Sequence, residues 1–165
     1  MAVNRGKQFE DVIREAFEKV PGVSIDRLHD QTTKFKGTSA NICDFIVYRE
    51  PYEYYFECKS VHGNTLPFSN ITATQWNGLL AKSFIEGVIA GVICWWVDKN
   101  KTAFIPIQML QAMLNHGKKS ISHEQVTFVD SCGNGYSITI IEGKKKRVFF
   151  DYDMEEFLNE VQHNR

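Results

Sequence analysis

The chain has 165 residues, of which 43% are hydrophobic and 24% charged, and its formal net charge is −1. This balance is typical of an ordinary soluble globular domain, and it excludes overall basicity as a means of binding nucleic acid. Any such binding would depend on local basic patches, such as the run 144–147. The polar N-terminus shows no signal peptide, and the longest apolar run, 88–97, is too short to cross a bilayer. We therefore expect a single domain over residues 1–165, no membrane partner and a cytoplasmic location.

The first third of the chain predicts one helix followed by strands. Apolar residues recur at helical spacing from 4 to 20, and Pro21-Gly22 ends this amphipathic helix. Runs rich in branched and aromatic residues then alternate with polar segments. The elements predicted in order are a strand at 23–29, a polar loop at 30–41, and two strands at 42–49 and 54–61. The short turn between the last two strands predicts an antiparallel hairpin.

The rest of the chain adds helices to this sheet. A loop is predicted at 62–70, followed by a helix at 72–86 with Trp76, Leu79, Leu80 and Phe84 on its inner side. A buried strand at 88–97, a short strand at 102–105, and a helix opened by Pro106 and running through 114 come next. The last predicted elements are an irregular stretch at 115–135, a late hairpin of 136–141 with 147–152, and a terminal helix capped by Asp153 with Glu156. The order predicts the α/β class, with a mixed β-sheet flanked by helices.

Two carboxylates and one ammonium group are predicted to meet on the hairpin. Side chains alternate faces along a strand, so Glu57 and Lys59 point the same way. Asp44 lies on the partner strand, which can bring it beside them. Close carboxylates repel each other, and a hard divalent cation such as Mg²⁺ or Mn²⁺ removes that cost. Such a centre suits phosphodiester hydrolysis, with Lys59 orienting the attacking water or neutralising phosphate charge.

Further ligands and a plainer interpretation also follow from the sequence. Glu10 on the first helix could bind the cation through a water, and the carbonyl of Cys58 could supply another oxygen. The spacing alone favours a plainer interpretation, an exposed hairpin face with a surface Glu/Lys pair. Charges embedded in two strongly apolar strands favour the metal site. Gln75 could hydrogen-bond water or phosphate, or be only a polar residue in the first turn of a helix.

Several short motifs together resemble one enzyme family. They are Asn4-Arg5-Gly6-Lys7 with Phe9-Glu10, Cys43-Asp44-Phe45, Phe56-Glu57-Cys58-Lys59-Ser60, Leu66-Pro67-Phe68, Ile71 with Gln75, Gly91-Val92-Ile93 and Ile105-Pro106. Over residues 4–114 the chain resembles the Holliday junction resolvases of the RecU type, a branch of the PD-(D/E)XK nucleases. The resemblance implies the PD-(D/E)XK core, a homodimer, a need for Mg²⁺ or Mn²⁺, and paired cuts in a four-way DNA junction.

The resemblance also implies a role for each site residue. It makes Asp44 and Glu57 metal ligands, Lys59 catalytic, Glu10 an accessory acid, Gln75 a supporting polar residue, and Arg5 and Lys7 phosphate contacts. Lys34 and Lys36, in the polar loop, are further candidates for DNA contact because a loop can reach the backbone. Bacterial relatives carry a long stalk before the catalytic aspartate. Residues 30–43 are too few for it, and the compact chain resembles phage-encoded versions.

Three other functions are weighed against this one. One is a different PD-(D/E)XK nuclease, either restriction-like or flap-type, which would lack a preference for junctions over linear duplex. Another is a module that binds branched DNA without cutting it, and it would bind equally well in EDTA. A structural protein with no DNA role would show no salt-sensitive DNA binding. The intact set of Asp44, Glu57 and Lys59 favours an Mg²⁺-dependent endodeoxyribonuclease.

Overall fold

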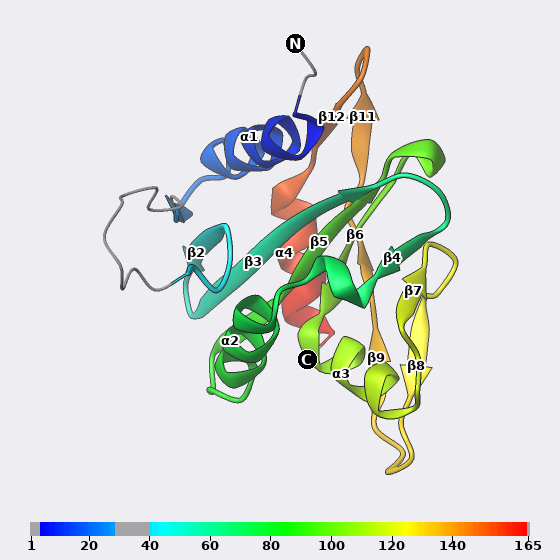
Figure 1. Ribbon diagram of the computed structural model, residues 1–165. Helices are drawn as coiled ribbons and strands as arrows, with labels where there is room; N and C mark the ends of the chain where they lie inside the picture. The colour runs from blue at the N-terminus through cyan, green and yellow to red at the C-terminus, as the bar shows by residue number, and fades with distance from the viewer. Residues whose placement is uncertain (1–3, 29–39, 165) are drawn as a thin grey trace.

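The computed structural model describes residues 4–28 and 40–164, and its centre is a six-stranded mixed β-sheet with helices on both faces (Figure 1). The strand order is β1-β2-β3-β5-β6-β10. The strands are β1 (Ser24–Arg27), β2 (Phe45–Arg49), β3 (Tyr52–Val61), β5 (Val88–Trp96), β6 (Lys101–Pro106) and β10 (Thr139–Ile140). Only β3 and β5 pair in parallel, and the other neighbours are antiparallel. The predicted α/β class with a mixed sheet is confirmed.

The sheet separates two hydrophobic cores, each covered by two helices. The helices α1 (Arg5–Glu18) and α4 (Met154–His163) pack on one face, and α2 (Ala73–Ser83) and α3 (Ile107–Asn115) pack on the other (Figure 1). All nine residues of β5 are buried, because its side chains alternate between the two cores. Trp95 faces the α1/α4 side and Trp96 the α2/α3 side. The predicted buried strand at 88–97 is therefore confirmed.

Local sequence signals fix where the first two helices begin. The side chain of Asn4 caps α1 by accepting a hydrogen bond from the backbone N–H of Lys7 at 3.3 Å. The capping box of α2 is reciprocal, because Thr72 and Gln75 each bind the other's backbone N–H. The apolar stripe of α1 supplies Phe9, Ile13, Ala16 and Phe17 to the core. These starts hold the N-terminal turns of α1 and α2 at fixed places beside the sheet.

Small two-stranded sheets complete the second half of the chain. They pair β4 (Thr65–Pro67) with β7 (Ser120–Ser122), β8 (Thr127–Val129) with β9 (Gly135–Ser137), and β11 (Gly143–Lys145) with β12 (Phe150–Tyr152). Two single-turn 3₁₀ helices, η1 (Phe68–Asn70) and η2 (Val97–Lys99), lie in connections. Over the stretch of chain that the structure covers, no helix is both long and apolar enough to span a membrane.

Several sequence predictions were wrong in this half. The loop at 62–70 contains β4, and the irregular stretch at 115–135 contains β7 and β8. β4 and β7 form through pairing between distant segments, whereas β8 pairs with the nearby β9. Residues 136–141 do not pair with 147–152; they divide between β9 and β10, and the late hairpin is β11–β12. The helix predicted to 86 ends at Ser83, so Phe84 lies past the last turn and is 73% exposed. Most of the predicted loop at 30–41, with Lys34 and Lys36, lies outside the described residues.

Candidate active site

The β2–β3 pairing brings the predicted acidic pair together. Phe45 is opposite Phe56 in the antiparallel register, which places Asp44 opposite Glu57. Asp44 lies one residue before β2 begins, whereas the sequence predicted it within the strand. Its position is nonetheless fixed, because its Oδ2 accepts a hydrogen bond of 2.7 Å from the backbone N–H of Cys58. The Asp44 N–H also donates to the Phe56 carbonyl at 3.1 Å.

Glu57 is the buried centre of the site. It is 2% exposed, in a strand whose other buried residues are apolar. Its Oε1 lies 2.7 Å from Lys59 Nζ and accepts a hydrogen bond of 2.7 Å from Gln75 Nε2. Its Oε2 is buried and has no hydrogen-bond partner in the described part of the chain. A buried, unpaired carboxylate oxygen is costly unless something else satisfies it.

Gln75 is held in the site by the start of α2. Its Oε1 accepts a hydrogen bond of 3.0 Å from the Thr72 N–H, and its own N–H donates to Thr72 Oγ1 at 3.2 Å. The same Oε1 accepts from Lys59 Nζ at 3.4 Å. The capping box therefore turns the amide so that its nitrogen faces Glu57. Sequence alone left two interpretations of Gln75 open, and the structure shows both, a helix-capping residue and a direct partner of the acidic pair.

The acidic pair is electrostatically strained. Burial first, and then the negative charge of Asp44, raise the pKa of Glu57, while Lys59 works in the opposite direction. Burial also raises the pKa of Asp44, against the hydrogen bond from Cys58 that lowers it. Both carboxyl groups thus resist ionisation in the protein alone. A nearby cation would reverse this, because an opposite charge favours the ionised form.

The donor set fits a hard divalent cation. Asp44, Glu57 and Cys58 line one cleft of about 330 Å³, together with Glu10, Lys59 and Gln75. Carboxylate and carbonyl oxygens are ligands that Mg²⁺ and Mn²⁺ prefer, and these ions retain several waters. Within residues 4–28 and 40–164, no group of three or more acidic, histidine or cysteine side chains is arranged around a common metal position. The protein would therefore offer two carboxylates, and its unpaired Glu57 Oε2 is the atom that most needs a cation.

Comparison with known proteins decides the family. The family described as RecU, Recombination protein U, matches residues 18–140 of the chain. The chain belongs to the RecU family. The matched range includes Asp44, Glu57, Lys59 and Gln75, and it leaves out most of α1 and everything after β10.

Two other comparisons add less information about the family. No curated protein sequence matches this RecU-family chain. Among solved structures, a Holliday junction resolvase, Hjc of the archaeal hyperthermophile Archaeoglobus fulgidus, is 20% identical, with a TM-score of 0.49 over 70% of this chain and 85% of that one. Neither comparison indicates a phage origin.

Glu10 lines the same cleft but is already paired. Its Oε2 accepts a hydrogen bond of 2.6 Å from Arg27 on β1, and Asp11 accepts another of 2.7 Å from the same guanidinium. Arg27 is half-buried and joins α1 to β1. Glu10 also acts on Asp44 through its charge and raises the pKa of that carboxyl. The structure therefore places this acid beside the pair with one oxygen held by Arg27, a partner that sequence analysis did not identify.

The N-terminal cations flank a residue that lines the cleft. Arg5 and Lys7 are exposed, and the neighbouring Gly6 lines the cleft itself. The Arg5 guanidinium is 3.4 Å from His62 Nε2, and His62 Nδ1 is 3.0 Å from Asp98 Oδ1. Sequence analysis did not connect these three residues, because only the fold brings η2 beside the end of β3. They fix the orientation of Arg5 on the side of the molecule that holds the site.

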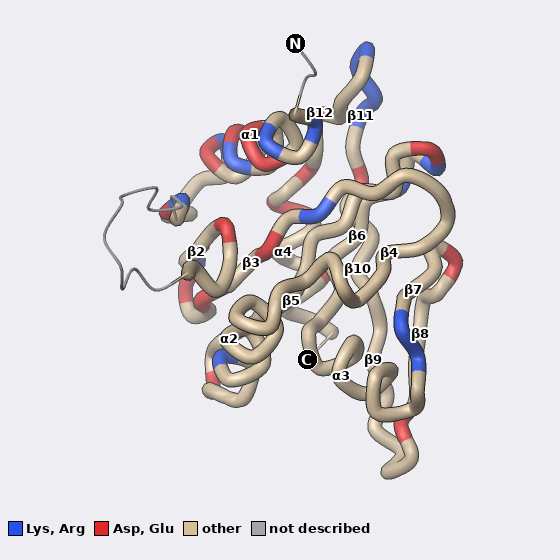
Figure 2. Tube along the Cα trace, viewed as in Figure 1, with Lys and Arg blue, Asp and Glu red and all other residues tan. Residues whose placement is uncertain are grey.

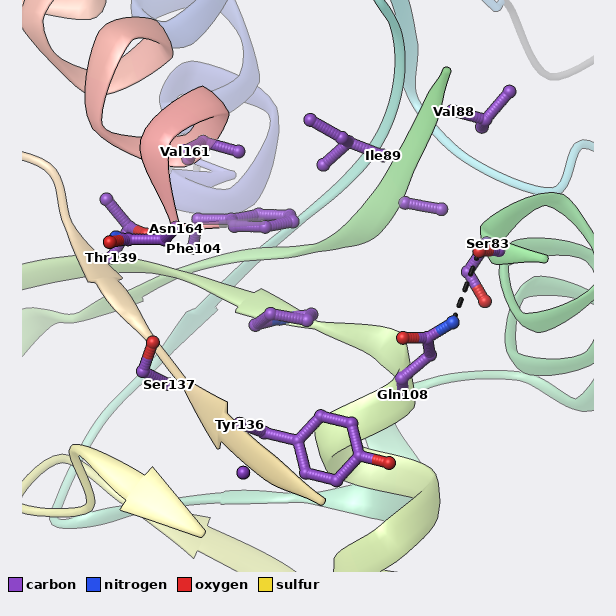
Figure 3. A pocket seen from close by; sticks show the side chains of 13 residues that line it. Ser83, Val88, Ile89, Phe104, Gln108, Tyr136, Ser137, Thr139, Val161 and Asn164 are labelled. Atoms are coloured by element: carbon purple, nitrogen blue, oxygen red, sulfur yellow. Dashed lines mark hydrogen bonds between the residues drawn. The ribbon is translucent and has the colours of Figure 1, made fainter. Parts of the chain in front are cut away.

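A second cavity lies away from the acidic pair and lacks the chemistry for hydrolysis. It measures about 250 Å³ and lies at the start of β5, between α4 and the β9–β10 segment (Figure 3). Figure 3 shows Gln108 donating to the Ser83 carbonyl on one side and Tyr136 on another. None of its lining residues is an acid, a lysine, an arginine or a histidine. Reaction chemistry is therefore assigned to the cleft at Asp44 and Glu57.

Proposed function

We propose that this protein is a divalent-metal-dependent DNA endonuclease that resolves four-way junctions and related branched DNA by paired phosphodiester nicks. The observation that carries the proposal is the cluster of Asp44, the buried Glu57 and Lys59, braced by Gln75, in a chain of the RecU family. A close acidic pair whose buried member lacks a complete set of partners is a functional arrangement more often than a stabilising one. Membership of the RecU family indicates the substrate class, and the residues of the cleft indicate the reaction.

The proposed chemistry follows from the atoms of the cleft. Asp44, Glu57 and the Cys58 carbonyl would hold Mg²⁺ or Mn²⁺, with Glu10 as an accessory acid through a water. The bound ion supplies Lewis acidity at the scissile phosphate. Lys59 orients the attacking water and offsets the charge that develops on the phosphate oxygens. Gln75 keeps Glu57 Oε1 oriented and holds the Lys59 ammonium between two oxygens.

The remaining parts of the proposal concern assembly and recognition. One chain carries one cleft of this kind, and two symmetric nicks need two, so we propose a homodimer with a twofold axis. Arg5, Lys7, Lys34 and Lys36 would contact phosphates, so that shape rather than base sequence is recognised. Mg²⁺ is the proposed physiological ion, with Mn²⁺ able to replace it. Residues 1–165 would act as a single nuclease domain in the cytoplasm.

The test is cleavage of a labelled four-way junction by the wild type and by Asp44→Asn, with Mg²⁺, with Mn²⁺ and with EDTA. We expect symmetric nicks that require the metal and disappear in the variant. Excess linear duplex serves as the competitor. A resolvase keeps cutting the junction in its presence, whereas a restriction-like or flap-type nuclease loses activity in proportion to the competitor.

One result would refute the proposal. If the wild type binds the junction tightly but cuts it with neither metal, the protein is a binding module for branched DNA. The expected oligomer is checked separately by sedimentation at the protein concentration of the cleavage assay. A monomer that produces paired nicks would contradict the proposed dimer alone.

A further inference from the structure

The β11–β12 hairpin lies outside the part of the chain that matches the RecU family, and it carries a concentrated positive charge. Four of the 19 Lys and Arg residues stand in consecutive positions, 144–147, across its turn. All four side chains are exposed. Figure 2 shows this basic tip at the same end of the molecule as the N-terminal turn of α1, which carries Arg5 and Lys7. In a chain of net charge −1, such local concentration is not a consequence of composition.

The hairpin is anchored by aromatic packing. The Phe149 ring lies 5.4 Å from that of Trp95, and Phe150 stacks on Tyr152 at 5.6 Å. Tyr152 is buried, and its hydroxyl is 2.7 Å from Thr102 Oγ1. Gly143 permits the close strand pairing, because a Cβ there would lie 2.9 Å from the Tyr152 ring. The two strands therefore form a firm support for the charged turn.

Polar contacts fix the turn to its neighbours on both sides. On the α1 side, Lys19 pairs with Asp151 at 2.9 Å, and Lys146 lies 3.7 Å from the same carboxylate. These two cations lower the pKa of Asp151, so it stays ionised. On the other side, Lys145 donates to the Asn100 side chain at 2.8 Å. The orientation of the turn is thus set before any ligand arrives, which lowers the entropy cost of binding.

A groove lies between the hairpin and α1. One face of α1, from Arg5 to Lys19, forms one wall, and residues 146–151 form the other. The groove measures about 630 Å³. Its acidic lining residues are Glu15 and Asp151, against four cations, namely Arg5, Lys19, Lys146 and Arg147. Since Lys19 and Lys146 share Asp151, the unneutralised charge lies at the tip and at Arg5.

We propose that the β11–β12 tip and the N-terminal turn of α1 form one binding surface for the phosphate backbone of a duplex DNA arm. The surface would hold that arm beside the cleft at Asp44 and Glu57. Lys144 and Arg147 make no ion pair or hydrogen bond within the described residues, so their charges are available to phosphates. The inference rests on the proposed nuclease function and adds the part of the chain that the family match leaves out.

The test compares three double variants of the full-length protein. Lys144→Gln with Arg147→Gln removes two charges from the tip. Lys118→Gln with Lys119→Gln is the matched control, because those exposed lysines precede β7, well away from the tip (Figure 1). Lys144→Arg with Arg147→Lys keeps the charge. Affinity for a fluorescent four-way junction is measured in EDTA from 50 to 300 mM salt, and cleavage is measured in Mg²⁺.

The expected result follows from counterion release. Each phosphate contact contributes about 0.9 to the slope of log K against log salt, so losing two lowers its magnitude by about 1.8. At 0.1 M salt this corresponds to binding roughly 10- to 60-fold weaker. The control and the charge-conserving variant should stay within about twofold of the wild type. Thermal unfolding of all variants should coincide, since the substituted side chains are exposed.

Failure of this inference can be distinguished from failure of the proposed nuclease function. If the wild type binds and cuts the junction but the tip variant shows the same affinity and salt slope, the hairpin is not a DNA contact and the nuclease proposal stands. If the wild type neither binds nor cuts the junction, both proposals fall. An equal loss in the Lys118/Lys119 control would also overturn the inference, because the effect would then reflect net charge and not the tip.

Discussion

Replacing Glu57 by Gln should stabilise the metal-free protein. The substitution keeps the shape of the side chain and its contact with Gln75, and it removes a buried charge that Asp44 opposes. Two unit charges 4 Å apart repel by about 4 kcal/mol at an effective dielectric constant near 20, and the attraction of Lys59 at 2.7 Å is about 6 kcal/mol on the same scale. The pKa of Glu57 is nevertheless raised, because the loss of hydration on burial, its largest cause, adds to the repulsion and outweighs the attraction. Since each pKa unit is worth about 1.4 kcal/mol, we expect removal of this charge to give a net gain of about 2 kcal/mol.

The gain is measured by thermal unfolding in EDTA at pH 8. For a chain of this length, 1 kcal/mol shifts Tm by about 2–4 °C, so Glu57→Gln should unfold about 4–8 °C higher than the wild type. Glu86→Gln is the control, because Glu86 is exposed and its side chain makes no ion pair or hydrogen bond within residues 4–28 and 40–164, and it should change stability by less than about 0.5 kcal/mol. Adding Mg²⁺ should raise the Tm of the wild type by linkage and leave that of Glu57→Gln nearly unchanged.

The sign of the pH dependence provides an internal check. Because the pKa of Glu57 is raised in the folded protein, the unfolded chain loses this proton first as pH rises. The folded state then binds more protons, and the stability of the metal-free wild type falls as pH rises above the usual carboxyl range. The advantage of Glu57→Gln should therefore shrink towards pH 5. A variant less stable than the wild type at pH 8 in EDTA would refute the strained acidic pair.

Three further predictions concern single residues. Lys59→Gln should lower the cleavage rate about 10²- to 10³-fold in single-turnover assays, because one charge-stabilising donor is lost, and unchanged cleavage would remove Lys59 from the reaction. Gln75→Ala should lower it about 10- to 100-fold, with a larger apparent metal requirement measured by Mg²⁺ titration, and an effect on stability alone would leave Gln75 a capping residue. Gly91→Ala should lower the free energy of unfolding by more than about 3 kcal/mol in denaturant titrations, because its Cβ would lie 2.2 Å from the Ile105 carbonyl oxygen. Gly135→Ala is the matched control, because nothing lies within 4 Å of the Cβ that it adds.

The sequence predicts those elements whose periodicity is strong and whose partners are near. The helix at the N-terminus, the hairpin that carries Glu57 and the buried strand β5 all follow from spacing and turn residues. The strand alternation also predicts correctly that Glu57 and Lys59 share a face. These signals are local, so they can be recognised without knowledge of the fold.

Several of the failures come from pairing between distant segments, whereas β8–β9 and β11–β12 are local hairpins whose register the sequence pattern did not predict. β7 forms only because Ser120–Ser122 meets Thr65–Pro67, and residues 136–141 split because β8 and β6 each take a part. The partners of the site residues follow the same rule. Arg27 holds Glu10 across two elements, and Asp98 orients His62 from another connection. The local sequence around Glu10 does not indicate Arg27 as its partner, and the sequence around His62 does not indicate Asp98.

The position of β3 inside the sheet determines how much of the fold must open before the active site is disrupted. β3 is hydrogen-bonded to β2 on one side and to β5 on the other, and it carries both Glu57 and Lys59. Its amides can exchange with solvent only when the central sheet opens, and such opening requires free energies close to that of global unfolding. Glu57 and Lys59 therefore belong to the last part of the molecule to open.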